Sequence, residues 1–188
     1  MEKFIQRKNS VLSKLDKSSK GDWDKRIVNL CNKINSSEEY YTTSSCAGRG
    51  VLILDEDKKR KGLFVKVYHD EISFEQLKED LILSLKENKQ IKFKLEPCIL
   101  HVACKDLVVA QKLFDKAKLV GWKRSGIISM TNNIILELNS TEKLEFPIIS
   151  SNKILVDDNF LKIIVKEANK KLKKSWKKID ELERIMEL

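Results

Sequence analysis

The sequence predicts an α+β fold, with a single domain over residues 1–188 built from a mixed, largely antiparallel sheet and several packed helices. Apolar residues recur at helical spacing in five segments, and short β-branched runs come partly in pairs that suit hairpins. No Gly/Ser-rich linker divides the chain, in which Pro97 and Pro147 are the only prolines. Hairpin strands argue against a doubly wound parallel sheet of the Rossmann type.

Two of the expected helices have clear ends. Ser73 precedes Gln76 by three residues, which is the spacing of a capping box. Asp106 is placed to cap the next helix, and Gly121 ends it. The expected helices cover residues 4–15, 23–34, 73–85, 106–121 and 158–187.

Runs of β-branched and aromatic residues predict the strands. Asn132 and Asn133 lie between the last two runs and indicate a hairpin. Each half of the chain holds several strands and a helix, as an internal duplication would produce. The expected strands cover residues 40–46, 50–54, 63–69, 91–95, 99–104, 126–130 and 134–138.

The charge balance points to a polyanionic partner. The chain has 37 Lys and Arg against 28 Asp and Glu, a net charge of +9, which favours nucleic acid binding. A lysine-rich solvated surface is the alternative. No apolar run reaches the ~20 residues of a membrane helix, and the start lacks the apolar core of a signal peptide. We therefore expect a cytoplasmic protein without a membrane partner.

The four cysteines show no CxxC pair, so thiols are expected. Cys98, His101 and Cys104 are spaced three apart, but residues 99–104 read as a strand, whose side chains alternate between faces. Cys98 and Cys104 should point one way and His101 the other, so no metal site is expected. The chain also lacks GxGxxG, Walker, GxSxG and HExxH motifs.

Residues 40–49 are the most informative segment. Residues 40–43 favour a strand, and Ala47 with Gly48 would let the backbone approach a ligand closely. Hydroxyl groups, a thiol and Arg49 would then meet at a strand end, where they could form a polar site. The alternative is a strand followed by an ordinary glycine turn.

Two further clusters could carry chemistry. Glu96 and Pro97 stand at the entrance of the strand that contains His101, and an imidazole ordinarily titrates at about pH 6.5, which suits proton transfer. A half-buried structural histidine is the alternative. Trp122, Lys123 and Arg124 lie between two glycines; such a loop could stack a base and hold a phosphate, or simply cap a helix.

The order of four blocks resembles the wybutosine-synthesis methyltransferase family, which methylates N4 of the tricyclic guanosine derivative in phenylalanine tRNA. The blocks are residues 15–21, 41–49, 96–102 and 121–126, and residues 44–49, Ser-Ser-Cys-Ala-Gly-Arg, are the most specific part. The resemblance runs from about residue 4 to the final helix. It implies S-adenosylmethionine as the methyl donor, tRNA(Phe) modified at position 37 as the acceptor, and a fold unlike the Rossmann type.

The sequence departs from the family pattern at two places. Relatives often carry a tryptophan where this chain has Leu63, Phe64 and Val65, and an arginine where it has Asn139. These positions bear on the details of substrate contact.

Site roles follow from the resemblance together with side-chain chemistry. His101 is the candidate general base, with Asp16 as the second choice, because the acceptor nitrogen must lose a proton. The expected donor site comprises Ser44, Ser45, Gly48, Arg49, Glu96 and Pro97. The expected tRNA site comprises Lys17, Lys20, Lys59, Arg60, Trp122, Lys123, Arg124 and Ser125. Two other functions remain open: an RNA-binding module without chemistry, which leaves Glu96 and His101 without a role, and a small-molecule binding protein, which leaves the basic excess unexplained.

Overall fold

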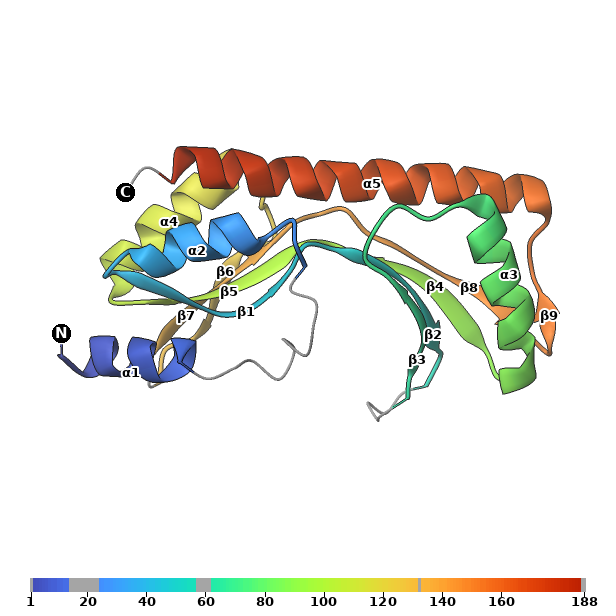
Figure 1. Cartoon of the computed structure of the whole chain (residues 1–188), viewed down its shortest axis with the longest axis horizontal. Coiled ribbons are helices and arrows are strands. Elements are labelled where there is room, and N and C mark those ends of the chain that lie inside the picture. Colours follow the sequence, from blue (N-terminus) through green and yellow to red (C-terminus); the bar gives the residue numbers. More distant parts are fainter. Residues whose placement is uncertain (1, 14–23, 57–61, 132, 187–188) are drawn as a thin grey trace. The chain divides into compact units, whose positions relative to one another are not determined.

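Two antiparallel sheets and five α-helices make up the described part of the computed structural model, which covers residues 2–13, 24–56, 62–131 and 133–186 (Figure 1). Every strand pair in this part of the chain is antiparallel, so the predicted α+β class is confirmed. The first unit comprises residues 1–47, 98–141 and 175–188, and the second comprises residues 48–97 and 142–174. The single domain over residues 1–188 stays a prediction.

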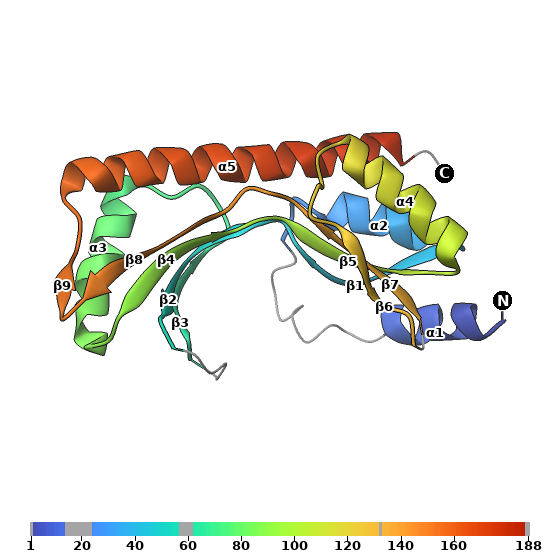
Figure 2. The ribbon, with the colours of Figure 1, turned by 180° about the vertical axis from the view of Figure 1, so that it is seen from behind.

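The sheet of the first unit has four strands in the order β1-β5-β7-β6. Figures 1 and 2 show α2 and α4 over one face of this sheet and α1 against the other. The elements are α1 (Glu2–Leu12), α2 (Val28–Ser36), β1 (Tyr40–Cys46), β5 (Ile99–Cys104), α4 (Leu107–Leu119), β6 (Gly126–Ser129), β7 (Ile134–Asn139) and the C-terminal part of α5 (Asp158–Ile185).

Side-chain alternation in the strands creates the core of this unit. Leu100 and Val102 of β5 and Leu136 and Leu138 of β7 are fully buried, whereas His101, which lies between the first two, is only partly buried. Cys98 and Cys104 are buried as well. The predicted opposite orientation of His101 and the two cysteines is therefore confirmed.

The sheet of the second unit has five strands in the order β3-β2-β4-β8-β9. Its core contains Leu52, Phe93 and Leu95 from the strands and Leu77 and Leu81 from α3. The elements are β2 (Arg49–Leu54), β3 (Phe64–Tyr68), α3 (Phe74–Ser84), the short 3-10 helix η2 (Leu85–Glu87), β4 (Ile91–Glu96), β8 (Leu144–Ser150), β9 (Lys153–Ile154) and the N-terminal part of α5.

The predicted helix caps are confirmed. Ser73 Oγ accepts a hydrogen bond from the Gln76 backbone N–H at 3.0 Å, and Asp106 accepts one from Val109 at 2.8 Å. Gly121 follows α4 with a φ of 94°, a left-handed conformation that suits glycine. The hairpin of β6 and β7 is also present.

Several elements differ from the prediction, among them the short strand β9 and the 3-10 helix η2, which were not expected. Strand β8 was not among the expected strands. It contains Pro147, which cannot donate to a sheet ladder, but Pro147 lies where the register with β4 shifts, and a register shift tolerates proline. The second helix begins at Val28 rather than at residue 23. In the described part of the chain, no helix is both long and apolar enough to cross a membrane.

Candidate active site

A row of polar side chains crosses three strands of the first unit. Ser44 of β1 pairs with His101 of β5, and His101 pairs with Glu137 of β7. Paired residues of neighbouring strands point to the same face. The row therefore lies on the face opposite to the buried Leu100 and Val102.

Hydrogen bonds connect this row. Ser44 Oγ lies 2.9 Å from Nδ1 of His101, and Nε2 of His101 lies 2.9 Å from Oε2 of Glu137. The other carboxylate oxygen of Glu137 accepts a longer bond of 3.4 Å from Asn139 Nδ2. Ser44 is exposed, while the side chains of His101 and Glu137 are 28% and 27% exposed. The hydroxyl group is thus the outermost member of the row.

A β-bulge determines which hydroxyl meets the imidazole. The β1–β5 register shifts between Thr42 and Ser44, so Ser44 rather than Thr43 lies opposite His101. Ser45 points to the other face, where its hydroxyl hydrogen bonds to Cys31 of α2. Burial is the main reason why the pKa of Cys31 rises to about 11. The two adjacent serines assigned to the donor therefore lie on opposite faces of the sheet.

The second unit holds the other candidate residues. Arg49 Nε lies 2.7 Å from Oε2 of Glu96, and Lys94 Nζ lies 3.1 Å from Oε1 of the same carboxylate. The guanidinium also stacks on the Phe64 ring, 4.9 Å from its centroid. Burial alone would raise the pKa of Glu96, but the hydrogen bonds and charges of Arg49 and Lys94 outweigh it and hold that pKa below its usual value.

Gly48 and Pro97 shape the backbone next to this ion pair. Gly48 precedes Arg49 with a φ of 96°, in the left-handed region that favours glycine. Pro97 follows Glu96 between β4 and β5. Because Arg49 pairs with Glu96 in antiparallel strands, Gly48 and Pro97 lie at the same end of this strand pair, where β2 begins and β4 ends.

In the loop after α4, the structure contradicts the predicted base-stacking role of Trp122. Trp122 is fully buried, and its indole N–H donates to the Lys178 carbonyl at 3.1 Å. Ser125 Oγ donates to the Trp122 carbonyl at 2.6 Å and accepts from the Asn139 backbone. Trp122 and Ser125 therefore build the fold of the first unit, and Trp122 offers no ring to a base. Lys123 and Arg124 are exposed and stay predictions as phosphate contacts.

Several predicted site residues lie outside the described residues: Asp16, Lys17, Lys20, Lys59 and Arg60. The described ranges contain no group of three or more His, Cys, Asp or Glu side chains that could hold a metal ion.

Sequence reasoning missed Glu137 and Lys94. Glu137 is the one carboxylate in the apolar run Ile134–Leu138, and this isolation was a usable signal. Its partner His101 lies 36 residues away, so only the strand register identifies the pair.

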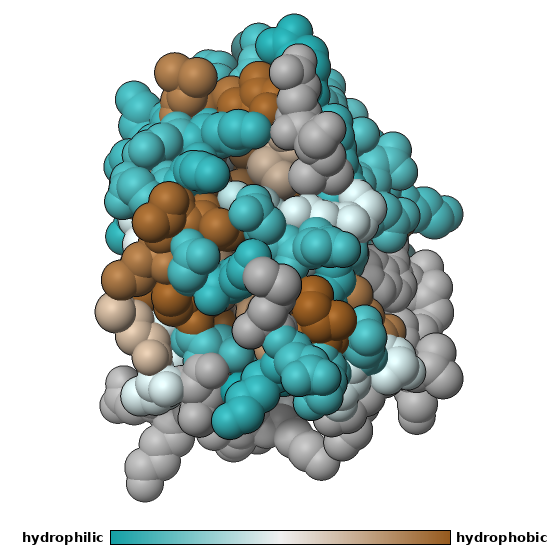
Figure 3. Space-filling view, turned by 90° about the vertical axis from the view of Figure 1, so that its left-hand side faces the viewer, coloured by the Kyte–Doolittle hydropathy of each residue, from teal (hydrophilic) through white to brown (hydrophobic). Residues whose placement is uncertain are grey.

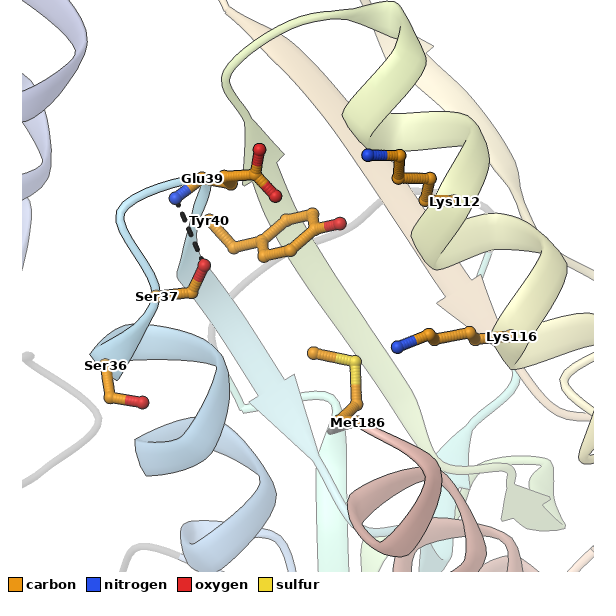
Figure 4. Close-up of a pocket in the computed structure, with 7 residues that line it drawn as sticks. All are labelled: Ser36, Ser37, Glu39, Tyr40, Lys112, Lys116 and Met186. Atoms are coloured by element: carbon orange, nitrogen blue, oxygen red, sulfur yellow. Dashed lines mark hydrogen bonds between the residues drawn. The ribbon is translucent and has the colours of Figure 1, made fainter. Parts of the chain in front are cut away.

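A separate pocket of about 700 Å³ lies on the other face of the first sheet (Figure 4). Its wall includes Tyr40, whose hydroxyl donates to the Val109 carbonyl of α4 at 3.1 Å and whose pKa burial raises to about 12. Figure 4 shows the ammonium groups of Lys112 and Lys116 reaching into it from α4, with the Glu39 carboxylate opposite. This pocket is distinct from the Ser44–His101–Glu137 row, because it lies on the opposite face of the sheet and is lined by two lysines and a glutamate.

Exposed apolar side chains also gather on the first unit, at the edge strand β6 and at the start of α4. They are Leu107, Val108, Ile127, Ile128 and Met130. Apolar patches are visible among hydrophilic residues on the surface shown in Figure 3. An apolar strand edge of this kind does not suit a phosphate backbone.

Comparisons with known proteins agree over nearly the whole chain. A family model described as Methyltransferase TYW3 matches residues 6–187. The chain is 35% identical over 171 residues to an Archaeoglobus fulgidus protein named tRNA(Phe) 7-((3-amino-3-carboxypropyl)-4-demethylwyosine(37)-N(4))-methyltransferase, which covers 89% of this chain and 84% of that protein. It is 35% identical over 179 residues to a Methanocaldococcus jannaschii protein of the same name, and this alignment covers 92% of this chain and 91% of that protein.

Two solved structures share the fold of this chain. The structure of the PH1069 protein from Pyrococcus horikoshii superposes with a TM-score of 0.87 at 33% identity and covers 98% of this chain and 94% of that one. A hypothetical protein from Aeropyrum pernix superposes with a TM-score of 0.73 at 25% identity, over 85% and 94% of the two chains.

Proposed function

The chain belongs to the Methyltransferase TYW3 family, and we propose that it transfers a methyl group from S-adenosylmethionine to N4 of a wyosine-type guanosine at position 37 of tRNA(Phe). The names of the two archaeal relatives support this acceptor. The hydrogen-bonded imidazole of His101 is the structural observation that carries the proposal, since N-methylation releases a proton that a nearby base can take.

The residues of the second unit fit a donor that carries a carboxylate. Arg49 reaches Glu96 through Nε, and a guanidinium that is held in this way can still offer its terminal nitrogens to a carboxylate or phosphate. Glu96 and the Phe64 ring keep the guanidinium in place, and Lys94 binds the other oxygen of the Glu96 carboxylate. When bound, S-adenosylmethionine supplies an electrophilic methyl group.

The first unit supplies the acid–base chemistry. His101 is the base that neutralises the proton released on methylation, and Glu137, 2.9 Å from Nε2, stabilises the resulting imidazolium. A base of this kind typically contributes about 10²–10⁴-fold to the rate. Holding the acceptor nitrogen in line with the methyl group contributes further through positioning.

The first experiment is methyl transfer from labelled S-adenosylmethionine to tRNA(Phe) from cells that lack this protein, with mature tRNA(Phe) as the reference acceptor. Label should enter only the undermodified tRNA, at position 37. His101→Ala should lower turnover by about 10²-fold or more while donor binding is unchanged. The chain has one other histidine, His69, which is exposed, so His69→Ala is the matched control and should remain active.

Two results would contradict the proposal. Donor binding without transfer to any tRNA(Phe) precursor would refute the proposed acceptor. Absence of both donor binding and transfer would instead favour an RNA-binding module, for which binding of tRNA alone is the remaining measurement.

A further inference from the structure

Both ring nitrogens of His101 are occupied, which determines where its protons lie. Glu137 as a carboxylate can only accept hydrogen bonds. The Nε2 atom, 2.9 Å from Glu137 Oε2, must therefore carry a hydrogen and donate it. In the neutral imidazole this leaves Nδ1 with a lone pair, because only one ring nitrogen is protonated.

The hydrogen bond at Nδ1 then has a fixed direction. Ser44 Oγ lies 2.9 Å from Nδ1, so its hydroxyl hydrogen points at the imidazole and its oxygen lone pairs point away from it. Ser44 is exposed, whereas His101 is 28% exposed and sits behind it in the row. An incoming acceptor N–H thus meets the serine oxygen before it meets a ring nitrogen.

Glu137 is itself held in position. Asn139 Nδ2 donates to its second oxygen at 3.4 Å, and the Asn139 backbone is fixed by Ser125 Oγ at 3.1 Å and by the Arg124 N–H at 3.0 Å. The β1 bulge aims Ser44 at the ring from the other side. The row is therefore supported at both of its ends.

We propose that His101 acts through Ser44, which touches the acceptor instead of belonging to the donor site expected from the sequence, and that Glu137 is a positioning residue that sets the tautomer of His101. This inference rests on the proposed methyl transfer. As the N–CH₃ bond forms, the S–CH₃ electron pair stays on sulfur and the acceptor N–H proton passes to Ser44 Oγ. The Ser44 hydroxyl proton moves to Nδ1 of His101 in the same step, which gives an imidazolium paired with Glu137. Serine ends as it began, so the step needs no other reactant.

Kinetics test the relay. Ser44→Ala should lower the single-turnover rate about 100-fold while the Kd values for S-adenosylmethionine and tRNA(Phe) stay unchanged, and Ser44→Thr should recover much of the loss. Thr43→Ala, which removes the neighbouring hydroxyl, is the matched control. An active wild-type enzyme whose rate falls less than threefold in Ser44→Ala would overturn the relay and leave the proposed function intact. A wild-type enzyme that transfers no methyl group would overturn both.

The tautomer of neutral His101 is a second test, because a purely structural role of Glu137 would not change it. Nitrogen NMR of protein with isotope-labelled histidine, in the His69→Ala background, should show Nε2–H and an unprotonated Nδ1 for neutral His101. Glu137→Gln should mix the two tautomers, because an amide can donate to Nε2 as well as accept from it. A protonated Nδ1 in the neutral ring of the otherwise unchanged chain would overturn the assignment to Glu137, as would an unchanged tautomer in Glu137→Gln.

Discussion

Arg49 Nε and Glu96 Oε2 lie 2.7 Å apart across the β2–β4 pair of the second unit. Lys94 Nζ lies 3.1 Å from the other oxygen of the carboxylate. The Glu96 carboxylate thus forms ion pairs with both Arg49 and Lys94 on a partly buried face of the sheet. The arrangement fixes the guanidinium and also makes folding depend on the ionisation of Glu96.

Glu96 should make the stability of the chain sensitive to acid. Its pKa is lower in the folded chain than in the unfolded one, because Arg49 and Lys94 favour the charged form more strongly than burial opposes it. The ionised carboxylate therefore favours folding fully above about pH 4.5, and this contribution is lost as the pH falls through the folded pKa.

Urea unfolding of the wild type and of Glu96→Gln at several pH values measures the contribution of Glu96 to stability. At neutral pH the variant should be less stable by about 1 kcal/mol, and the difference should narrow in acid. A difference that grew as the pH fell would reverse the sign and contradict the assignment. Glu145→Gln, which removes an exposed carboxylate with one cation 3.6 Å away, is the control.

Trp122 and its two basic neighbours should respond in different ways to mutation. Trp122→Phe removes the N–H that donates to Lys178, so the free energy of unfolding should fall by about 1–2 kcal/mol while the salt dependence of tRNA binding is unchanged. Lys123→Ala and Arg124→Ala should leave the free energy of unfolding nearly unchanged. If the side chain neutralises a phosphate, each substitution should reduce the slope of the logarithm of the tRNA binding constant against the logarithm of the salt concentration by about 0.7 to 0.9. Filter binding of tRNA(Phe) at several salt concentrations measures the slopes, and unchanged slopes in both variants would remove this loop from the tRNA surface.

The cysteines should differ in reactivity. Burial raises the pKa of Cys31 to about 11 and that of Cys104 to about 12, and Cys98 is also buried. Thiolates are the reactive form, so iodoacetamide at about pH 8 should modify the native protein at Cys46, which is less buried. Mass spectrometry locates the label, and in concentrated guanidinium chloride all four cysteines should react. Fast labelling of Cys104 in the native protein would contradict its burial.

Gly121 should tolerate a side chain poorly. Its φ of 94° is in the left-handed region, and an added Cβ would lie 2.9 Å from Cε of Lys178. Gly121→Ala should therefore cost about 1–2 kcal/mol. Gly126→Ala is the matched control, since a Cβ there meets nothing within 4 Å, and its stability should change by less than about 0.5 kcal/mol. Thermal unfolding of both variants measures this difference. If Gly121→Ala were as stable as Gly126→Ala, the backbone at Gly121 would relax without cost.

The sequence by itself determined the local features of this protein. The caps at Ser73 and Asp106 and the stop at Gly121 depend on groups only a few residues apart, so the sequence pattern was enough to predict them. The same holds for residues 98–104, where side-chain alternation along β5 and the residue before it predicts that His101 lies on the opposite face from Cys98 and Cys104. The family followed from residues 44–49 and the order of the other blocks.

Only the tertiary structure decided which residues share a sheet and a face. Strands β1 and β2 are separated by two residues, yet they belong to different sheets. The bulge in β1 places Ser44 opposite His101, whereas Ser45 points to the other face and hydrogen bonds to Cys31. The register of β5 and β7 places Glu137 beside the imidazole, although the two residues are 36 positions apart in the sequence. Register depends on the summed packing and hydrogen bonding of whole strands, so a local pattern predicts that a histidine faces outward but not which groups its two nitrogens meet.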